Sequence, residues 1–300
     1  MKPEYADRHP NTRMSILPSC QLLIVSYHKD AEWCFYNLKS IMKYCRGFLK
    51  PVLAIPTRDV EVFKPHLDVC DVKLITYDEI EGKGMLQHML KICHADELCE
   101  GDIIVCSDSD CHFWNYVTPE TYFYQGKPCI FRVAYSYLEG TPNFRWKGAA
   151  ERALGFEVLY ETMMRHPLTY KRDMLPGFRA HIEGFAQKPF DEYVLAQENS
   201  FPQGFAEHST LGAYALKFHA DEYSLFDYIK TPDGTATWYP PVPEDYVGVF
   251  WSHGGISESQ RAYLEKVTSA EYEPGPGGKQ EKLSDAPSWR EPRKGDPDAL

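Results

Sequence analysis

The first part of the chain alternates between short apolar runs and stretches with apolar residues at helical spacing. The apolar runs have the length of strands, and nearly continuous ones are typical of strands buried on both faces. They lie at residues 21–27, 50–56, 71–80 and 102–108. The stretches with helical spacing lie at residues 30–45, 59–67 and 84–95. Because strands that alternate with helices form parallel sheets, we expect an α/β fold with a mostly parallel twisted sheet, helices on both faces and a Rossmann-like N-terminal half.

The pattern becomes less regular after residue 113. A further strand is predicted at 128–138, and a long helix is predicted within 146–167, where Pro167 would end it. Further helices are predicted at 172–187, 190–201 and 205–219, and the apolar run 246–255 is expected to close the fold.

The two ends of the chain differ from the part between them. Residues 1–18 are polar and contain proline, and residues 274–300 are rich in proline, glycine and charge. We therefore expect a flexible lead and a disordered tail. Between them we expect one domain from 19 to 273, made of an N-terminal half (19–113) and a C-terminal half (114–273).

Composition and charge narrow the possible functions. The chain has 300 residues, of which 43% are hydrophobic and 25% are charged, and this is typical of a globular protein with a sizeable core. The formal net charge of −11 argues against binding nucleic acid through a broad basic face. The nine cysteines form no CxxC pair, the start does not resemble a signal peptide, and no run of about 18 apolar residues exists. We therefore expect a soluble cytoplasmic protein with reduced thiols, in a bacterium or a virus-infected cell.

Two carboxylates follow the fourth predicted strand. Asp108 and Asp110 stand two residues apart, at the edge of the sheet where ligands bind in open α/β folds. Two carboxylates held close together favour a divalent cation, and oxygen ligands select ions such as Mg²⁺ or Mn²⁺. A solvated turn is the alternative that the residues alone leave open. The loops 26–30 and 57–59 are expected at the same edge.

Several stretches of the chain resemble the glycosyltransferases of the GT-A fold. The resemblance extends over about residues 20–260 and rests on LLIVSYHKD near the start, GMLQHMLKI before the fourth predicted strand, CSDSDCHFW at its end, and the late FWSHGG. It implies a metal-dependent enzyme that moves a sugar from a nucleotide sugar, with a uridine diphosphate sugar as the expected donor, to a hydroxyl acceptor. Residues 19–113 would bind the nucleotide sugar, and residues 114–273 would bind the acceptor.

The same resemblance assigns roles to residues at the predicted ligand edge. A Mn²⁺ or Mg²⁺ ion on the donor diphosphate would be held by Asp110, by Asp108 and by a late histidine, His253. Asp108 would also serve the ribose. Further contacts with the donor nucleotide would come from Ser26, Tyr27, His28, Asp30, Arg58 and Lys91. The cation would stabilise the negative charge that develops on the leaving diphosphate.

The sequence gives fewer signals for the residues that would bind and activate the acceptor. An inverting transfer needs a carboxylate that takes the proton of the acceptor hydroxyl. Glu207, beside a histidine and among aromatic residues, is the main candidate, and Asp191 is an alternative that a helix N-terminus would explain equally well. The candidates for an acceptor groove have side chains suited to sugars or bases: Trp146, Arg145 and Tyr137.

Other interpretations stay open. A nucleotidyltransferase on a related fold would share the metal carboxylates, and a catalytically inert nucleotide-binding module would share the fold. A haloacid-dehalogenase-type phosphatase also ends a strand with DxD, but normally the first strand. The acceptor could be a glycan, a small molecule or a hydroxymethylated base in viral DNA. The last of these would require a basic groove that forms only in three dimensions.

Overall fold

A central sheet of five strands organises the molecule. The computed structural model describes residues 17–68, 70–200, 204–230, 236–240, 247–250 and 255–272. The strand order is β3-β2-β1-β4-β9. These strands are β1 (Cys20–Val25), β2 (Leu49–Pro56), β3 (Lys73–Tyr77), β4 (Ile103–Cys106) and β9 (Leu168–Lys171). The first four are parallel and β9 runs antiparallel to β4, so the predicted mostly parallel sheet is confirmed.

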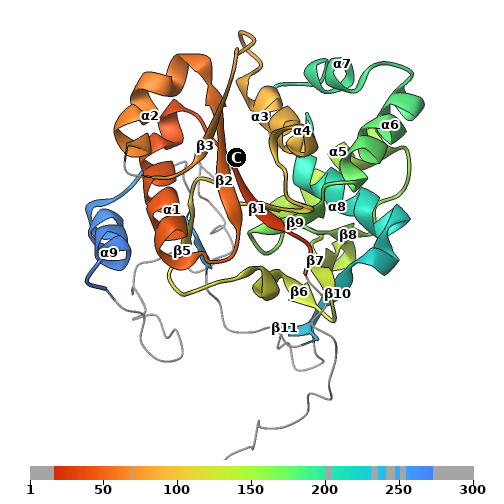
Figure 1. Ribbon diagram of the computed structural model, residues 1–300. Coiled ribbons are helices and arrows are strands. Elements are labelled where there is room, and N and C mark those ends of the chain that lie inside the picture. Colours follow the sequence, from red (N-terminus) through yellow and green to blue (C-terminus); the bar gives the residue numbers. More distant parts are fainter. Residues whose placement is uncertain are drawn as a thin grey trace, which may run out of the picture.

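Helices cover both faces of this sheet (Figure 1). One face carries α1 (Ala31–Tyr44), α2 (Val60–Leu67) and α9 (Glu258–Thr268). The other carries α3 (Gly84–Cys93), α4 (Ala95–Leu98), α5 (Trp146–Leu154), α6 (Met174–Ala186), α7 (Phe190–Leu195) and α8 (Glu207–Phe218). All residues of β1 and β4 are buried, because both strands lie between the two helix layers. The predicted α/β fold is confirmed.

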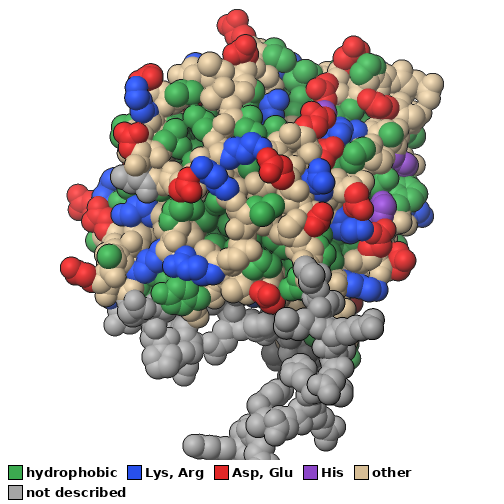
Figure 2. Space-filling view, viewed as in Figure 1, with side chains coloured by type: hydrophobic (Ala, Val, Ile, Leu, Met, Phe, Trp, Pro, Cys, Tyr) green, Lys and Arg blue, Asp and Glu red, His purple; other side chains and the backbone are tan. Residues whose placement is uncertain are grey.

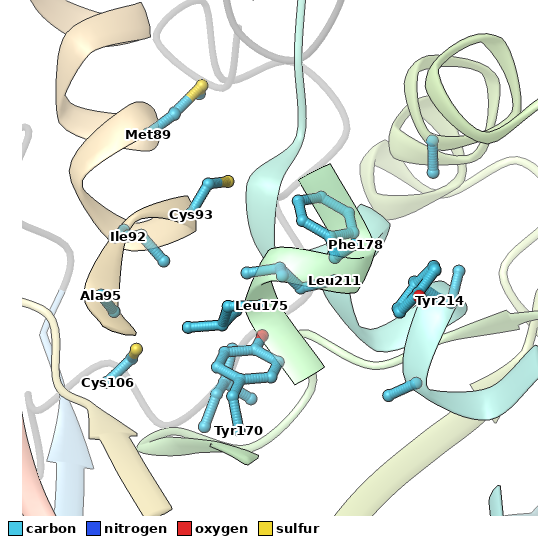
Figure 3. Packing of buried hydrophobic residues seen from close by; sticks show 14 of the residues in the cluster. Met89, Ile92, Cys93, Ala95, Cys106, Tyr170, Leu175, Phe178, Leu211 and Tyr214 are labelled. Carbon is cyan, nitrogen blue, oxygen red and sulfur yellow. The ribbon is translucent and has the colours of Figure 1, made fainter. Parts of the chain in front are cut away.

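The core on the α3 side joins the N-terminal half of the chain to the C-terminal half. In Figure 3, Ile92 and Cys93 of α3 lie across from Leu211 of α8, and all three side chains are buried. Tyr170 of β9 lies below them in the same cluster. Side chains from both halves therefore share one core, and this fixes the position of α8 relative to β4.

The remaining strands form two further sheets. The larger has the order β11-β10-β7-β6, and β8 also pairs with β7. Its strands are β6 (Phe123–Tyr124), β7 (Lys127–Ala134), β8 (Tyr160–Glu161), β10 (Ser224–Lys230) and β11 (Ala236–Tyr239). The smaller joins β5 (Cys111–Phe113) to β12 (Val247–Val249) in antiparallel fashion. The strand predicted at 128–138 corresponds to β7, which ends earlier, at Ala134.

The long helix predicted within residues 146–167 is wrong. Helix α5 ends at Leu154, and the next residue, Gly155, has a φ of 73°. The N–H of Gly155 donates a hydrogen bond to the carbonyl of Glu151 at 2.9 Å. Glycine adopts this left-handed conformation at little cost, and it commonly ends a helix in this way. The chain then leads through β8 to β9.

The ends of the chain lie largely outside the described residues. These undescribed parts are residues 1–16, in the predicted lead, and residues 273–300, which include the predicted tail. Within the described ranges, no helix is both long enough and apolar enough to cross a membrane.

Candidate functional site

The carboxylate pair stands at the carboxyl edge of the central sheet, directly after β4. The N–H of Ser107 continues the pairing with β1 by donating to the carbonyl of Leu23 at 2.9 Å. Ser109, between the two aspartates, donates its hydroxyl to that of Ser26 at 2.8 Å. Both serines are buried, so Ser26 supports the loop from beneath. The Ser26 hydroxyl is therefore not exposed for the nucleotide contact that the sequence predicted.

A buried asparagine on α1 fixes the shape of this loop. The Asn37 side-chain amide donates to the hydroxyl of Ser107 at 3.1 Å and to the carbonyl of Asp108 at 3.2 Å. It also donates to the carbonyl of Cys111. Asn37 was not among the residues predicted for this site. A polar residue on the buried face of the helix that follows β1 was the available signal.

Asp108 points toward histidines of the C-terminal half. Its carboxylate lies 3.5 Å from Nδ1 of His166 and 3.9 Å from Nε2 of His208, and its side chain is 40% exposed. Burial alone would raise the pKa of this carboxyl. Nearby histidines, His166 foremost, outweigh burial and hold the pKa below its usual value. Asp108 is therefore ionised at neutral pH.

Glu207 begins helix α8 close to Asp108. Its carboxylate lies 3.9 Å from Nε2 of His208, and only 11% of its side chain is exposed. Burial, and then the charge of Asp108, raise the pKa of Glu207 to about 8. Burial also lowers the pKa of His208 to about 3. The hydroxyl of Tyr170 lies 3.0 Å from Nδ1 of His208 and fixes the orientation of this uncharged imidazole.

One of the three predicted acceptor residues packs against the start of α8. Trp146 is buried and packs with Ala206, the residue before Glu207. Arg145 and Tyr137 are exposed. Trp146 therefore supports the segment that leads into Glu207, whereas Arg145 and Tyr137 lie at the surface.

Asp191 is not brought to this site. Its carboxylate contacts Nε2 of His94 at 2.7 Å, and His94 follows the last turn of α3. The strands of a parallel sheet and the helices between them run in opposite directions, so this end of α3 lies near the start of β4. Asp191 is thus at the edge of the sheet opposite Asp108, and Glu207 is the carboxylate that the fold places at the candidate site.

The predicted donor residues gather after β1 and β2. Tyr27 precedes a short 3-10 helix that contains His28 and Asp30. The backbone N–H of His28 donates to the buried carboxylate of Asp59 at 2.9 Å and so joins the two loops. Arg58 contacts Glu79 at 2.5 Å.

An open cavity of about 630 Å³ lies at the ends of β2 and β3. The residues that line it are Thr57, Arg58, Asp78, Glu79, Glu81 and Gly82. Lys91 does not line this cavity, and its ammonium group lies 5.0 Å from the centre of the Tyr77 ring. Of the predicted donor residues, Arg58 is therefore the one in the cavity wall.

Strand β12 reaches the carboxylate pair from the far end of the sequence. The N–H of Phe250 donates to the carbonyl of Asp110 at 2.9 Å, and β12 pairs with β5 just beyond. The predicted metal ligand His253 lies outside the described residues. Phe250, three residues before it, is the last described residue of this stretch.

The carboxylate pair suits a hard divalent cation. Mg²⁺ is usually bound by one or two carboxylates together with substrate phosphates, rather than by a cage of protein ligands. Asp108 and Asp110 are the residues that could supply oxygen ligands of this kind. In the part of the chain that the structure describes, no three His, Cys, Asp or Glu side chains form a metal-binding group.

No protein-family model matches the sequence, and no curated protein is significantly similar to it.

Proposed function

We propose that the protein is a metal-dependent glycosyltransferase that takes its sugar from a nucleotide sugar, with a uridine diphosphate sugar as donor, and passes it to a hydroxyl acceptor. One observation carries this proposal. An ionised Asp108 and a Glu207 that keeps its proton near neutral pH both lie within 3.9 Å of the same imidazole nitrogen of His208. Two carboxylates whose pKa values are pushed apart are typical of acid–base sites.

The loops at the carboxyl edge of the sheet would bind the nucleotide sugar. Asp108 and Asp110 would hold a Mn²⁺ or Mg²⁺ ion, which when bound supplies a Lewis acid for the charge on the leaving diphosphate. Asn37 keeps the loop between them in place through its bonds to the carbonyls of Asp108 and Cys111. Such fixed groups lose little entropy when the donor binds.

Glu207 would act on the acceptor hydroxyl. A carboxylate with a pKa of about 8 binds a proton more strongly than an ordinary one, so its ionised form is the better base. Tyr170 and His208 would position it, because the Tyr170 hydroxyl holds the ring that faces both carboxylates. The transfer rate should therefore rise with pH until about pH 8, where Glu207 is ionised. A cation bound at the aspartates would lower the pKa of Glu207, and the rate would then level off at a lower pH.

We also propose that the protein works in the cytoplasm. All nine cysteines are described, and all nine are free. Eight of them are buried, so they behave as small apolar core residues. Reduced thiols of this kind are usual in a reducing compartment.

The test is the release of nucleoside diphosphate from a panel of nucleotide sugars in the presence of Mn²⁺. We expect release from one donor, loss of release on adding EDTA, and a fall of at least a hundredfold in Asp110→Asn and in Glu207→Gln. Asp191→Asn is the matched control, since it removes a carboxylate at the opposite edge. Release that survives in both site variants would show that the reaction takes place elsewhere in the molecule.

A further inference from the structure

Glu161, the last residue of β8, has a carboxylate that the proposed reaction does not use. Among the described acidic residues, only Asp59, Glu161 and Glu207 are buried, and Glu161 is 0% exposed. On the face of the molecule shown in Figure 2, other acidic side chains lie at the surface, interspersed with basic ones. Taking a carboxylate out of water costs free energy, and an apolar side chain of similar size is often at least as stable in such a place. A buried carboxylate at this position therefore calls for a role.

Four uncharged groups donate hydrogen bonds to the Glu161 carboxylate. The backbone N–H groups of Thr162 and Met163 donate to Oε1, each at 2.8 Å. The hydroxyl of Ser209 lies 2.9 Å from both Oε1 and Oε2, and the hydroxyl of Tyr135 donates to Oε2. Both carboxylate oxygens are thus engaged. A buried polar network that is satisfied in this way fixes one arrangement of the segments that it joins.

Glu161 joins two segments that carry groups of the candidate site. One is the first turn of α8, which contains Ser209 and begins with Glu207. The other is the segment after β8, which leads to His166. The residue before α8 is Ala206, whose methyl group cannot accept a hydrogen bond from the N–H groups of the first turn. The bond between Ser209 and Glu161 therefore holds this turn from outside the helix.

A second contact joins the same two segments. The hydroxyl of Thr162 donates to the carbonyl of His208 at 3.4 Å. This bond is longer than those of the Ser209 hydroxyl to the Glu161 carboxylate, and hydrogen bonds weaken with length. The carboxylate therefore supplies the tighter connection between β8 and α8.

We propose that Glu161 is a positioning residue for the proposed transfer: it holds the first turn of α8 so that the Glu207 carboxylate faces the acceptor hydroxyl. This inference rests on the proposed function of Glu207. Because Glu161 is fully buried, it touches neither donor nor acceptor and acts through Ser209. Its loss should therefore slow the chemical step and leave the binding of the nucleotide sugar unchanged.

The test compares Ser209→Ala with Thr169→Val. Each removes one buried hydroxyl that donates a hydrogen bond, but the Thr169 hydroxyl donates to the carbonyl of Cys129 at 2.6 Å and so joins β9 to β7. Both variants should unfold at a lower urea concentration than the parent. Glu161→Gln is a third variant, since its amide keeps one acceptor oxygen but presents N–H groups to the two hydroxyls. Ser209→Ala is the smaller change and keeps the test decisive if Glu161→Gln does not fold.

Steady-state kinetics measures the release of nucleoside diphosphate, with Mn²⁺, from UDP-glucose, UDP-galactose, UDP-N-acetylglucosamine and GDP-mannose. We expect kcat to fall roughly tenfold to a hundredfold in Ser209→Ala and in Glu161→Gln, because a small misplacement of a catalytic group costs this much. The KM for the nucleotide sugar should not change, and Thr169→Val should keep both parent values. Hydrogen exchange needs no substrate. The amide of Thr210, which donates to the carbonyl of Ala206 at 2.9 Å, should exchange about fivefold faster in Ser209→Ala but not in Thr169→Val.

Equal kcat values for the parent and Ser209→Ala would overturn the inference, and so would a rise in KM with kcat unchanged. A fall in kcat that is as large in Thr169→Val would overturn it as well, because any buried hydrogen bond would then have the same effect. If the parent cleaves none of these nucleotide sugars, the proposed function is refuted. The exchange rate of the Thr210 amide still tests the positioning in that case, and equal rates in Ser209→Ala and the parent would refute it too.

Discussion

Asp108 and Glu207 lie near the same imidazole nitrogen, but their surroundings shift their pKa values in opposite directions. Asp108 is 40% exposed and lies close to His166, whose positive charge favours the ionised carboxylate. Glu207 is 11% exposed, and the charge of Asp108 adds to the effect of burial. The sequence could identify both carboxylates, because one follows an apolar strand and the other stands in an aromatic segment. It could not identify the histidine at position 166, because that residue meets Asp108 only after folding.

The raised pKa of Glu207 has a consequence for stability. In metal-free protein the unfolded chain loses this proton near pH 4.5, whereas the folded protein keeps it until about pH 8. The free energy of unfolding therefore falls as pH rises through this window. We expect Glu207→Gln to melt at a higher temperature than the parent in EDTA, with a difference that grows from pH 5 to pH 8. A difference that does not change with pH would contradict this assignment.

His112 is a buried histidine that packs between aromatic rings. Both of its ring nitrogens are buried without a hydrogen-bond partner, and the ring lies 5.7 Å from that of Trp33 and 5.2 Å from that of Phe250. Phenylalanine has no polar atom to leave unsatisfied. We expect His112→Phe to raise the free energy of unfolding by about 1 kcal/mol in urea denaturation at pH 7. His181→Phe is the control and should destabilise, because Nε2 of His181 bonds to the carbonyl of Leu154 at 2.9 Å.

At the scale of elements, short apolar runs predict strands well, whereas apolar spacing alone does not show where a helix ends. The strands β1, β2, β3 and β4 were predicted to within a few residues, because each is a short apolar run. The helix predicted to Pro167 failed because its apolar spacing continues past Gly155, where the backbone leaves the helix. The sheet around β7 was not predicted, since β7 and β10 pair across about 95 residues of chain.

Helix α8 carries Glu207, and a glycine lets it lie close to β8. A Cβ atom on Gly212 would stand 1.8 Å from the hydroxyl oxygen of Thr162. We expect Gly212→Ala to lower the free energy of unfolding by about 1–3 kcal/mol, because α8 or Thr162 must move. The measurement is urea denaturation, with nucleotide release as a second readout.

The matched change for α8 is Gly184→Ala in α6. A Cβ there meets nothing within 4 Å, and alanine favours a helix by roughly 0.5–1 kcal/mol. This variant should be as stable as the parent or slightly more stable. If both variants behave alike, close packing at Gly212 is not what positions α8.

At the scale of the whole molecule, the candidate site lies where the two halves of the chain meet. The N-terminal half supplies the aspartates and His88, and the C-terminal half supplies Glu207 and two further histidines. The shared core between α3 and α8 fixes the positions of these groups relative to one another (Figure 3). The sequence predicted the edge of the sheet at which ligands bind, because parallel strands all end there. It could not predict which side chains of the second half reach that edge, since this depends on how the second half packs.

The most direct test of the central claim is a thermal-shift titration of nucleoside diphosphates with and without Mn²⁺, on the parent and on Asp110→Asn. Ligand at about 100 times its Kd adds roughly 2.7 kcal/mol of stability. For a chain of this size that is a shift of a few degrees. We predict a shift with one nucleotide that requires Mn²⁺, disappears in Asp110→Asn and persists in Asp191→Asn. No shift with any nucleotide, or an equal shift in Asp110→Asn, would contradict a cation held between these carboxylates and a diphosphate.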